Sequence, residues 1–208
     1  IIIIPNYLQS IDYKMYADDI SLTSAPVSYT GPIQQIAGKK VNALSFDGYD
    51  DYAKIADSDN LDLTDKFTIA FWVKRESGAG FGVISKDGGG DTTGAYNVYI
   101  SSNGNVQYEV NNQVPPMTIS SVATIPLNTW SHVAVTFDDS LIDKKLKIYI
   151  NGAESVSGNP VQPSILNTDL LIGRRGLGSF FKGSIDELAI YKKTLSAEEV
   201  RGLYDQTK

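Results

Sequence analysis

Four acidic residues in two short segments have the types and spacing that suit a hard cation. Asp47, Asp50 and Asp51 lie within five residues beside Gly48, and Asp186 lies in a second segment, residues 183–191. Carboxylates this close repel one another unless water screens them or a cation lies between them. Calcium takes six to eight oxygen ligands, from carboxylates and backbone carbonyls. We therefore expect the two segments to pair in space and to share a calcium ion.

The expected ligands differ in kind. The carboxylates of Asp47 and Asp186 would bind the ion directly, and Gly48 can turn its carbonyl inward because it lacks a Cβ. Asp51 is a further expected ligand, whereas Asp50 is expected to face water. Such a site would tie the first and last strands of the domain together and would stabilise only the folded state. The alternative is that these acids bond local backbone amides in a turn.

The composition narrows the classes of partner. The chain has 208 residues, with 18 basic and 24 acidic side chains, a formal net charge of -6 and no cysteine. The negative charge argues against nucleic acid and anionic membrane surfaces, which attract basic faces. The lack of cysteine excludes disulfides, thiolate catalysis and zinc-thiolate sites. No stretch approaches the ~20 apolar residues that span a bilayer, so we expect no membrane insertion.

Alternating polar and apolar residues predict an all-β chain. Asn103-Gly104, between two such runs, predicts a tight hairpin. Ser196 and Glu199 form a capping-box pattern, with Leu195 and Val200 as a hydrophobic staple, and predict one short C-terminal helix. Together these features predict a two-sheet antiparallel sandwich, with a polar loop over residues 155–167. The predicted strands are 67–73, 81–85, 96–100, 106–110, 117–125, 132–137, 145–150, 170–173 and 185–191.

An ordered set of segments resembles the laminin-G-like jelly-roll domains of the concanavalin A-like lectin/glucanase group. The set runs from about residue 41 to 205. The resemblance implies a two-sheet jelly roll, a structural calcium on the side away from the concave face, and binding of glycans or proteins rather than catalysis. The segments that carry it are 46–52 (FDGYDDY), 67–74 (FTIAFWVK), 130–138 (WSHVAVTFD), 146–152 (LKIYING), 171–173 (LIG), 181–191 (FKGSIDELAIY) and 195–200 (LSAEEV).

Residues 1–26 lie outside this resemblance, and residues 27–208 form the predicted domain. Residues 16–22 have the pattern of a strand, and residues 23–26 that of a linker. The segment is either the last strand of an upstream module or an extension that packs on this domain or on a neighbouring chain. The apolar start, residues 1–4, could add to a neighbour's sheet edge, because main-chain hydrogen bonds make such pairing strong.

Aromatic residues and an arginine are the candidates for binding a ligand. Sugars stack on exposed rings and bond to nearby polar groups. Trp72 lies opposite the strongly apolar face of its strand, and the loops 87–91 and 174–179 could frame a rim around it. The alternative is that Trp72 and Trp130 fill the core and that the tyrosines are ordinary strand residues. The candidate ligand-binding residues are Trp72, Tyr96, Tyr99, Tyr108 and Arg174.

The carboxylates and the single histidine do not form a catalytic pattern. Asp186 and Glu187 are strand neighbours that point to opposite faces. Glycoside hydrolysis needs two carboxyl groups about 5 to 9 Å apart on one face. His132, the only histidine, lies in a predicted strand and is expected to be structural.

The sequence therefore predicts a non-catalytic, calcium-stabilised domain for recognition or adhesion. Its expected location is extracellular or on a cell or virion surface, and its expected partner is a glycan or a surface protein. The alternative function is a self-assembling structural subunit of a filament, sheath, virion or tail. Such a subunit would form homo-oligomers through residues 1–26.

Overall fold

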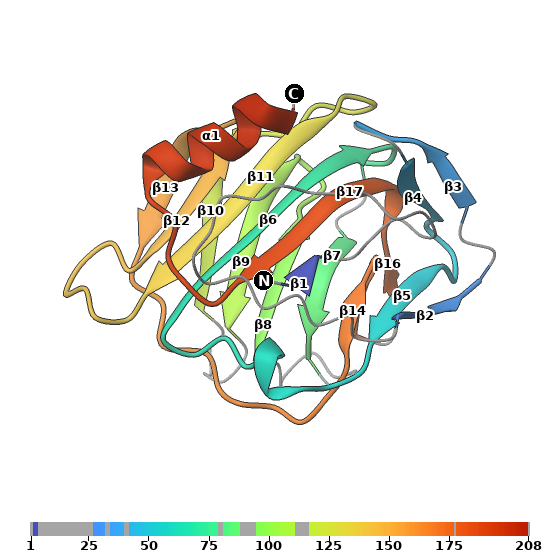
Figure 1. The fold of residues 1–208 in the computed structure, drawn as a ribbon. Coiled ribbons are helices and arrows are strands. Elements are labelled where there is room, and N and C mark those ends of the chain that lie inside the picture. The colour runs from blue at the N-terminus through green and yellow to red at the C-terminus, as the bar shows by residue number, and fades with distance from the viewer. Residues whose placement is uncertain are drawn as a thin grey trace.

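The domain is a sandwich of two antiparallel sheets (Figure 1). The structure, a computed structural model, describes residues 2–3, 27–31, 34–39, 42–78, 81–87, 95–110, 117–176 and 178–207. It confirms the predicted all-β jelly-roll sandwich with one short C-terminal helix. Among these residues, no helix has the length and apolar character needed to cross a membrane.

The first sheet has eight strands. They are β1 (Ile2–Ile3), β3 (Gln34–Ala37), β4 (Asn42–Asp47), β6 (Lys66–Arg75), β11 (Ser131–Asp138), β12 (Leu146–Ile150), β13 (Ala153–Gly158) and β17 (Lys182–Tyr191). Their order is β13-β12-β11-β6-β17-β4-β3, and β1 also pairs with β17. The last strand of the chain thus lies between two early ones, β4 and β6.

The second sheet has seven strands, in the order β10-β9-β8-β7-β14-β5-β2. A 3-10 helix, η1 (Asp59–Leu61), follows β5, and a small hairpin of β15 (Arg174–Arg175) and β16 (Ser179–Phe180) follows β14. The turn at Asn103-Gly104 joins β8 to β9, as predicted. The strands are β2 (Val27–Thr30), β5 (Tyr52–Ile55), β7 (Phe81–Lys86), β8 (Tyr96–Ile100), β9 (Asn105–Val110), β10 (Met117–Thr124) and β14 (Leu170–Ile172).

Strand β13 differs from the predicted loop at residues 155–167, and strand β1 bears on the predicted role of the N-terminal segment. β13 occupies residues that the sequence assigned in part to a loop, because a half-exposed edge strand lacks an apolar period. β1 pairs with β17 of the same chain, Ile2 opposite Ile190 and Ile3 opposite Ala189. Docking of this segment into a neighbour stays a prediction. The predicted strand over residues 16–22 and the linker over 23–26 lie outside the described residues.

One apolar core fills the space between the sheets. Phe67 on β6 lies at its centre, with ring centroids 5.2 Å from Phe137 and 6.4 Å from Tyr96. All three rings are fully buried. Truncating such a ring costs about 3 to 5 kcal/mol, so this stack is a major contribution to stability.

Helix α1 (Ala197–Thr207) packs on the outer face of the eight-stranded sheet, over β11 to β13 (Figure 1). The predicted capping box forms, since the Ser196 amide donates to Glu199 Oε2 at 2.7 Å and the Glu199 amide donates to Ser196 Oγ at 3.2 Å. Beneath the helix, Ala134, Ala70 and Ala189 lie directly opposite one another on β11, β6 and β17. Their small side chains leave room for the helix to approach the sheet.

The C-terminal half of α1 covers an aromatic pair on that sheet. The ring centroid of Trp72 lies 5.5 Å from that of His132 and 5.7 Å from that of Tyr204 on the helix. Trp72 Nε1 donates to Thr207 Oγ1 at 2.7 Å. His132 is 3% exposed, and burial lowers its pKa from 6.5 to about 4. The histidine therefore folds in its neutral form, as a structural residue.

The burial of His132 predicts that the stability of the folded protein falls in acid because of this residue. Between about pH 6.5 and 4 the unfolded chain binds a proton that the folded chain does not, so stability is lost as the pH falls through that window. We expect the free energy of unfolding to fall by about 2 to 3 kcal/mol more in the wild type than in His132→Gln between pH 7 and 4.5. Urea unfolding at both pH values measures this difference. Equal losses in the two proteins would contradict it.

Candidate functional site

The outer face of the seven-stranded sheet is polar, in contrast to the helix-covered face. Cross-strand register joins Thr118, Glu109, Asn97, Ser85, Leu171, Lys54 and Ser28 in one row from β10 to β2. Strand alternation brings further side chains to the same side. We define the polar face as Ser28, Tyr52, Lys54, Ser85, Asn97, Tyr99, Gln107, Glu109, Thr118 and Ser120.

The hairpin β15–β16 packs on this face over β7. Gly82 makes this contact possible, because a Cβ at that position would lie only 2.7 Å from the backbone nitrogen of Arg175 and 2.3 Å from the Arg175 Cβ. The Gly176 amide donates to the Asp87 carboxylate at 2.9 Å, and Asp87 is fully buried. The hairpin is therefore held against the sheet at both its first strand and its turn.

Glu109, on β9 near one edge of the sheet, is a buried member of the polar face and accepts three hydrogen bonds. Its donors are Arg175 Nη2 at 2.5 Å, Tyr99 OH at 3.2 Å and Thr118 Oγ1 at 3.4 Å. The Arg175 guanidinium also lies 4.5 Å from the centroid of the Tyr99 ring. Burial and the Glu109 charge raise the pKa of Tyr99, while Arg175 opposes this shift. The result is a fixed group of donors and acceptors around a half-buried ring.

Of the five predicted ligand-binding residues, Tyr99 and Arg174 lie at the surface here. Arg174 is half-buried on the hairpin, and its guanidinium lies against the rings of Tyr52 and Phe180. The sequence prediction missed both rings. Alternation could have indicated them, because Ala53 and Phe181, their chain neighbours, face the core.

The prediction that three other rings are open to a sugar is wrong. Trp72 is 3% exposed beneath α1, and Tyr96 and Tyr108 are fully buried in the core. The Tyr96 hydroxyl donates to the Leu61 carbonyl at 3.0 Å. On β8 and β9, these tyrosines alternate inward with valine and isoleucine, so only Tyr99 of the predicted rings reaches the outer face. Residues 88–91 of the predicted glycine-rich rim lie outside the described residues.

The acidic turn between β4 and β5 brings together the predicted ligands Asp47 and Asp51, and also Asp50, which was expected to face water and is exposed. Asp47, Asp50 and Asp51 each contribute one oxygen to a group whose members lie within 4.8 Å of one another. Asp47 Oδ1 accepts the amide hydrogens of Tyr49 at 2.7 Å and Asp50 at 3.3 Å, as in a turn. Gly48 has φ +81°, and a Cβ there would lie 2.7 Å from that of Lys182 on β17.

Asp51 is the buried member of this turn, at 3% exposure. Its Oδ2 accepts the Asp47 amide at 3.0 Å, whereas its Oδ1 is buried without a hydrogen-bond partner among the described residues. A Cβ added to Gly31 would lie 2.1 Å from this oxygen. Burial raises the pKa of Asp51, the hydrogen bond from the Asp47 amide lowers it, and the charges of Asp47 and Asp50 raise it.

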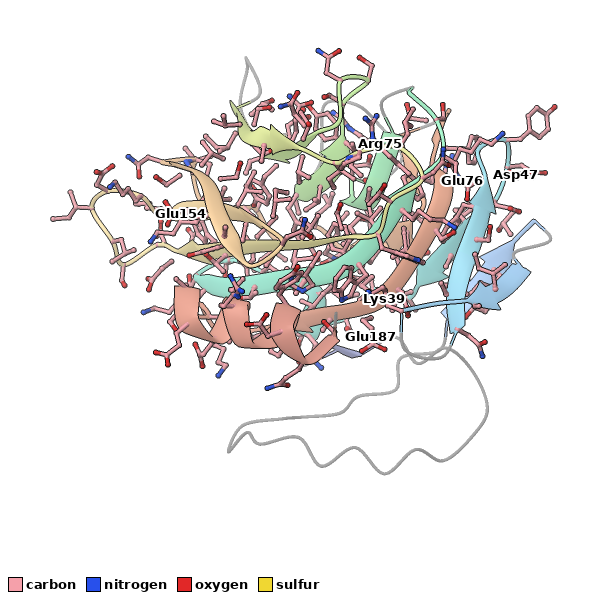
Figure 2. All side chains as sticks on the ribbon, turned by 90° about the horizontal axis from the view of Figure 1, so that it is seen from above. Lys39, Asp47, Arg75, Glu76, Glu154 and Glu187 are labelled. Atoms are coloured by element: carbon pink, nitrogen blue, oxygen red, sulfur yellow. The ribbon has the colours of Figure 1, made fainter. Side chains whose placement is uncertain are left out.

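Asp186 does not join this group, which corrects the predicted ligand set. The two segments do pair, but Lys182 lies opposite Asp47 in the β4–β17 register. Asp186 lies four residues further along β17, so it is ~13 Å from Lys182 along the strand and is well separated from Asp47. Its Oδ2 accepts the Lys39 amide at 2.7 Å. Figure 2 shows Lys39 and Glu187 together on the helix side of the molecule, away from Asp47.

Solved structures of other proteins share this fold. One of them is domain 4 of AbnA, a GH43 extracellular arabinanase from Geobacillus stearothermophilus, solved in complex with arabinotriose. It matches this chain with a TM-score of 0.70 and 25% sequence identity, and the match covers 86% of this chain and 88% of that chain. Botulinum neurotoxin type C, whose entry into cells depends on interaction with two ganglioside molecules, matches with a TM-score of 0.67 and 18% identity over 88% and 47%. The binding domain of botulinum neurotoxin DC, in complex with rat synaptotagmin II, matches with a TM-score of 0.66 and 17% identity over 88% and 47%. The present chain thus spans about half the length of the toxin chains, and their likeness shows the fold alone.

Sequence comparison agrees with the fold. No curated protein matches the sequence. Residues 47–201 match the Laminin_G_3 family, described as the concanavalin A-like lectin/glucanases superfamily. The matched span runs from the acidic turn into helix α1. It confirms the resemblance seen in the sequence. The chain therefore belongs to the Laminin_G_3 family of the concanavalin A-like lectin/glucanase superfamily.

Proposed function

We propose that this domain is a non-catalytic recognition module that binds glycans on the polar face. The observation that carries the proposal is the fixed group of Glu109, Arg175 and Tyr99. The ring of Tyr52 lies further along the same outer face, on β5. Helix α1 packs over β11 to β13 on the other outer face, whereas Thr118 and Ser120 of the polar face are exposed to a partner. The donors and acceptors of the polar face are already oriented, which lowers the entropic cost of binding.

The chemistry of the polar face suits a sugar. A sugar ring presents hydroxyl groups at its edge, which carboxylates, amides and guanidinium groups can bond. Its C–H groups form a less polar surface that stacks on aromatic rings. Gln107, Thr118 and Ser120 supply neutral donors and acceptors beside Glu109, and Tyr52 and Tyr99 supply half-buried rings.

The relatives support recognition as the role. Domain 4 of AbnA, at 25% identity, is in complex with arabinotriose, and AbnA is extracellular. Botulinum neurotoxins of this fold are described with gangliosides and with rat synaptotagmin II. We infer from these relatives that the partner is a glycan or a glycan-bearing surface protein. We infer also that the domain acts outside the cell or on a surface.

The polar face does not suit glycoside hydrolysis. Glu109 is the only carboxylate on β8 and β9, and its oxygens are held by Arg175, Tyr99 and Thr118. A hydrolase needs a second carboxyl group on the same face to act as its partner.

Replacing the half-buried ring of Tyr52 tests the glycan proposal. On a glycan array that includes arabino-oligosaccharides, we expect binding that Tyr52→Ala weakens about tenfold, because a lost stacking ring removes about 1.4 kcal/mol. The control is Ile142→Ala, since this side chain is 97% exposed on the β11–β12 turn of the other sheet. Calorimetry with the best array ligand gives the affinities. Absence of binding to every glycan, or equal loss in the control, would contradict the proposal.

We propose also that the acidic turn binds calcium. Asp47, Asp50 and Asp51 suit a hard cation because their oxygens lie close together and Asp51 Oδ1 is buried without a partner among the described residues. When bound, the ion would neutralise charge between β4 and β5, next to β2 at Gly31. The role would be structural, and Asp186 would not take part in it.

Thermal melting separates this ligand set from the one that includes Asp186. We expect calcium at about 100 times its Kd to add about 2.7 kcal/mol relative to chelator, and to raise Tm by about 5 to 10 °C. Asp51→Asn should abolish the difference between calcium and chelator, while Asp186→Asn should retain it. The same melting temperature in calcium and in chelator, or loss of the difference in Asp186→Asn, would refute the site.

A further inference from the structure

An arginine on the hairpin lies against two neighbouring aromatic rings at the edge of the polar face. The Arg174 guanidinium carbon lies 4.8 Å from the centroid of the Tyr52 ring and 5.5 Å from that of Phe180. The two ring centroids are 6.4 Å apart. Rings attract a cation over their faces and restrict its movement. We call Arg174, Tyr52 and Phe180 the arginine cradle.

The backbone around the cradle is fixed by its own hydrogen bonds. Arg174 Nε donates to the Gly176 carbonyl at 3.0 Å, and the Gly176 amide donates to buried Asp87 at 2.9 Å. Arg174 also lies opposite Phe180 in the β15–β16 register. The position of the guanidinium is therefore set before any ligand arrives.

The terminal nitrogens of Arg174 differ from the paired cations Arg175 and Lys54 in having no partner within the described part of the chain. Nη1 and Nη2 of Arg174 make no hydrogen bond and no ion pair with any described residue. Arg175 is paired with Glu109, and Lys54 is paired with Asp169 at 3.1 Å. A guanidinium carries five N–H donors, and here only the Nε–H is used.

We propose that the arginine cradle binds the carboxylate of an acidic sugar, such as a uronate. The two free Nη groups match the two oxygens of a carboxylate in a bidentate pair. Tyr52 and Phe180 lie beside the guanidinium and can stack on the ring that bears the carboxylate. This inference rests on the proposed glycan-binding function and adds a ligand class to it.

The net charge of -6 does not oppose such a ligand at short range. At 0.1 M salt, exposed charges are screened beyond about 10 Å, so the direct pair with Arg174 dominates. Binding of the acidic sugar should therefore require Arg174, and it should depend on the planar shape of the guanidinium as well as on its positive charge.

Calorimetry with trigalacturonate and its fully methyl-esterified form tests the proposal, because the two probes differ in charge at nearly constant shape. The wild type should prefer the acid. Arg174→Gln should weaken acid binding about 10- to 100-fold, and Arg174→Lys should give only partial recovery because lysine cannot form the bidentate pair. Both variants should weaken binding of the acid by a larger factor than binding of the ester. Arg201→Gln is the control, since Arg201 is exposed on α1 and paired with Asp205.

Two results would overturn the inference. One is equal affinity of the wild type for acid and ester, and the other is acid binding by Arg174→Gln at wild-type strength. If the domain still binds neutral glycans, the proposed function stands and only the cradle assignment fails. If it binds neither probe nor any neutral glycan, both fail. Thermal melting of the variants checks that each remains folded.

Discussion

The insertion of β17 between β4 and β6 is the constraint on which the rest of the structure depends. β17 is the last strand of the chain, and it bonds to both neighbours. Without it the eight-stranded sheet would separate into β13-β12-β11-β6 and β4-β3. The residues it joins are separated by more than 100 positions, so the sheet closes only at a high cost in loop entropy. The apolar core beneath the sheet compensates for that cost.

The same strand decides which outer face is covered. Helix α1 follows β17 directly, and the row Ala134, Ala70, Ala189 lets it lie close to the eight-stranded sheet. The outer face of the seven-stranded sheet carries instead a row of polar side chains and the hairpin β15–β16. The two faces thus differ in character: the helix side buries a second apolar cluster, and the polar face is the one that we propose as the binding surface.

Much of the fold could be predicted from local patterns. Alternation gave most strands, Asn103-Gly104 gave the hairpin, and Ser196 with Glu199 gave the helix start. Alternation also placed Trp72 correctly away from the core, but it could not show that α1 would cover the ring. β13 was missed in part because an edge strand with half-exposed residues has no apolar period.

The site was harder to predict because it depends on register and on short strands. The pairing of the segments around Asp47 and Asp186 was correct, yet the register places Lys182 opposite Asp47, and sequence does not reveal register. The arginine cradle depends on β15 and β16, which have two residues each and are too short to show periodicity. Tyr52 and Phe180 become neighbours only when this hairpin folds over β7.

The most direct measurement of the central claim is the location of a bound glycan by amide chemical-shift mapping. The strongest glycan-array ligand would be titrated into the labelled domain. The account predicts that the largest shifts fall on β5, β8, β9, β10 and the hairpin β15–β16. Shifts confined to α1 and the outer face of the eight-stranded sheet would contradict the assignment of the polar face as the binding surface.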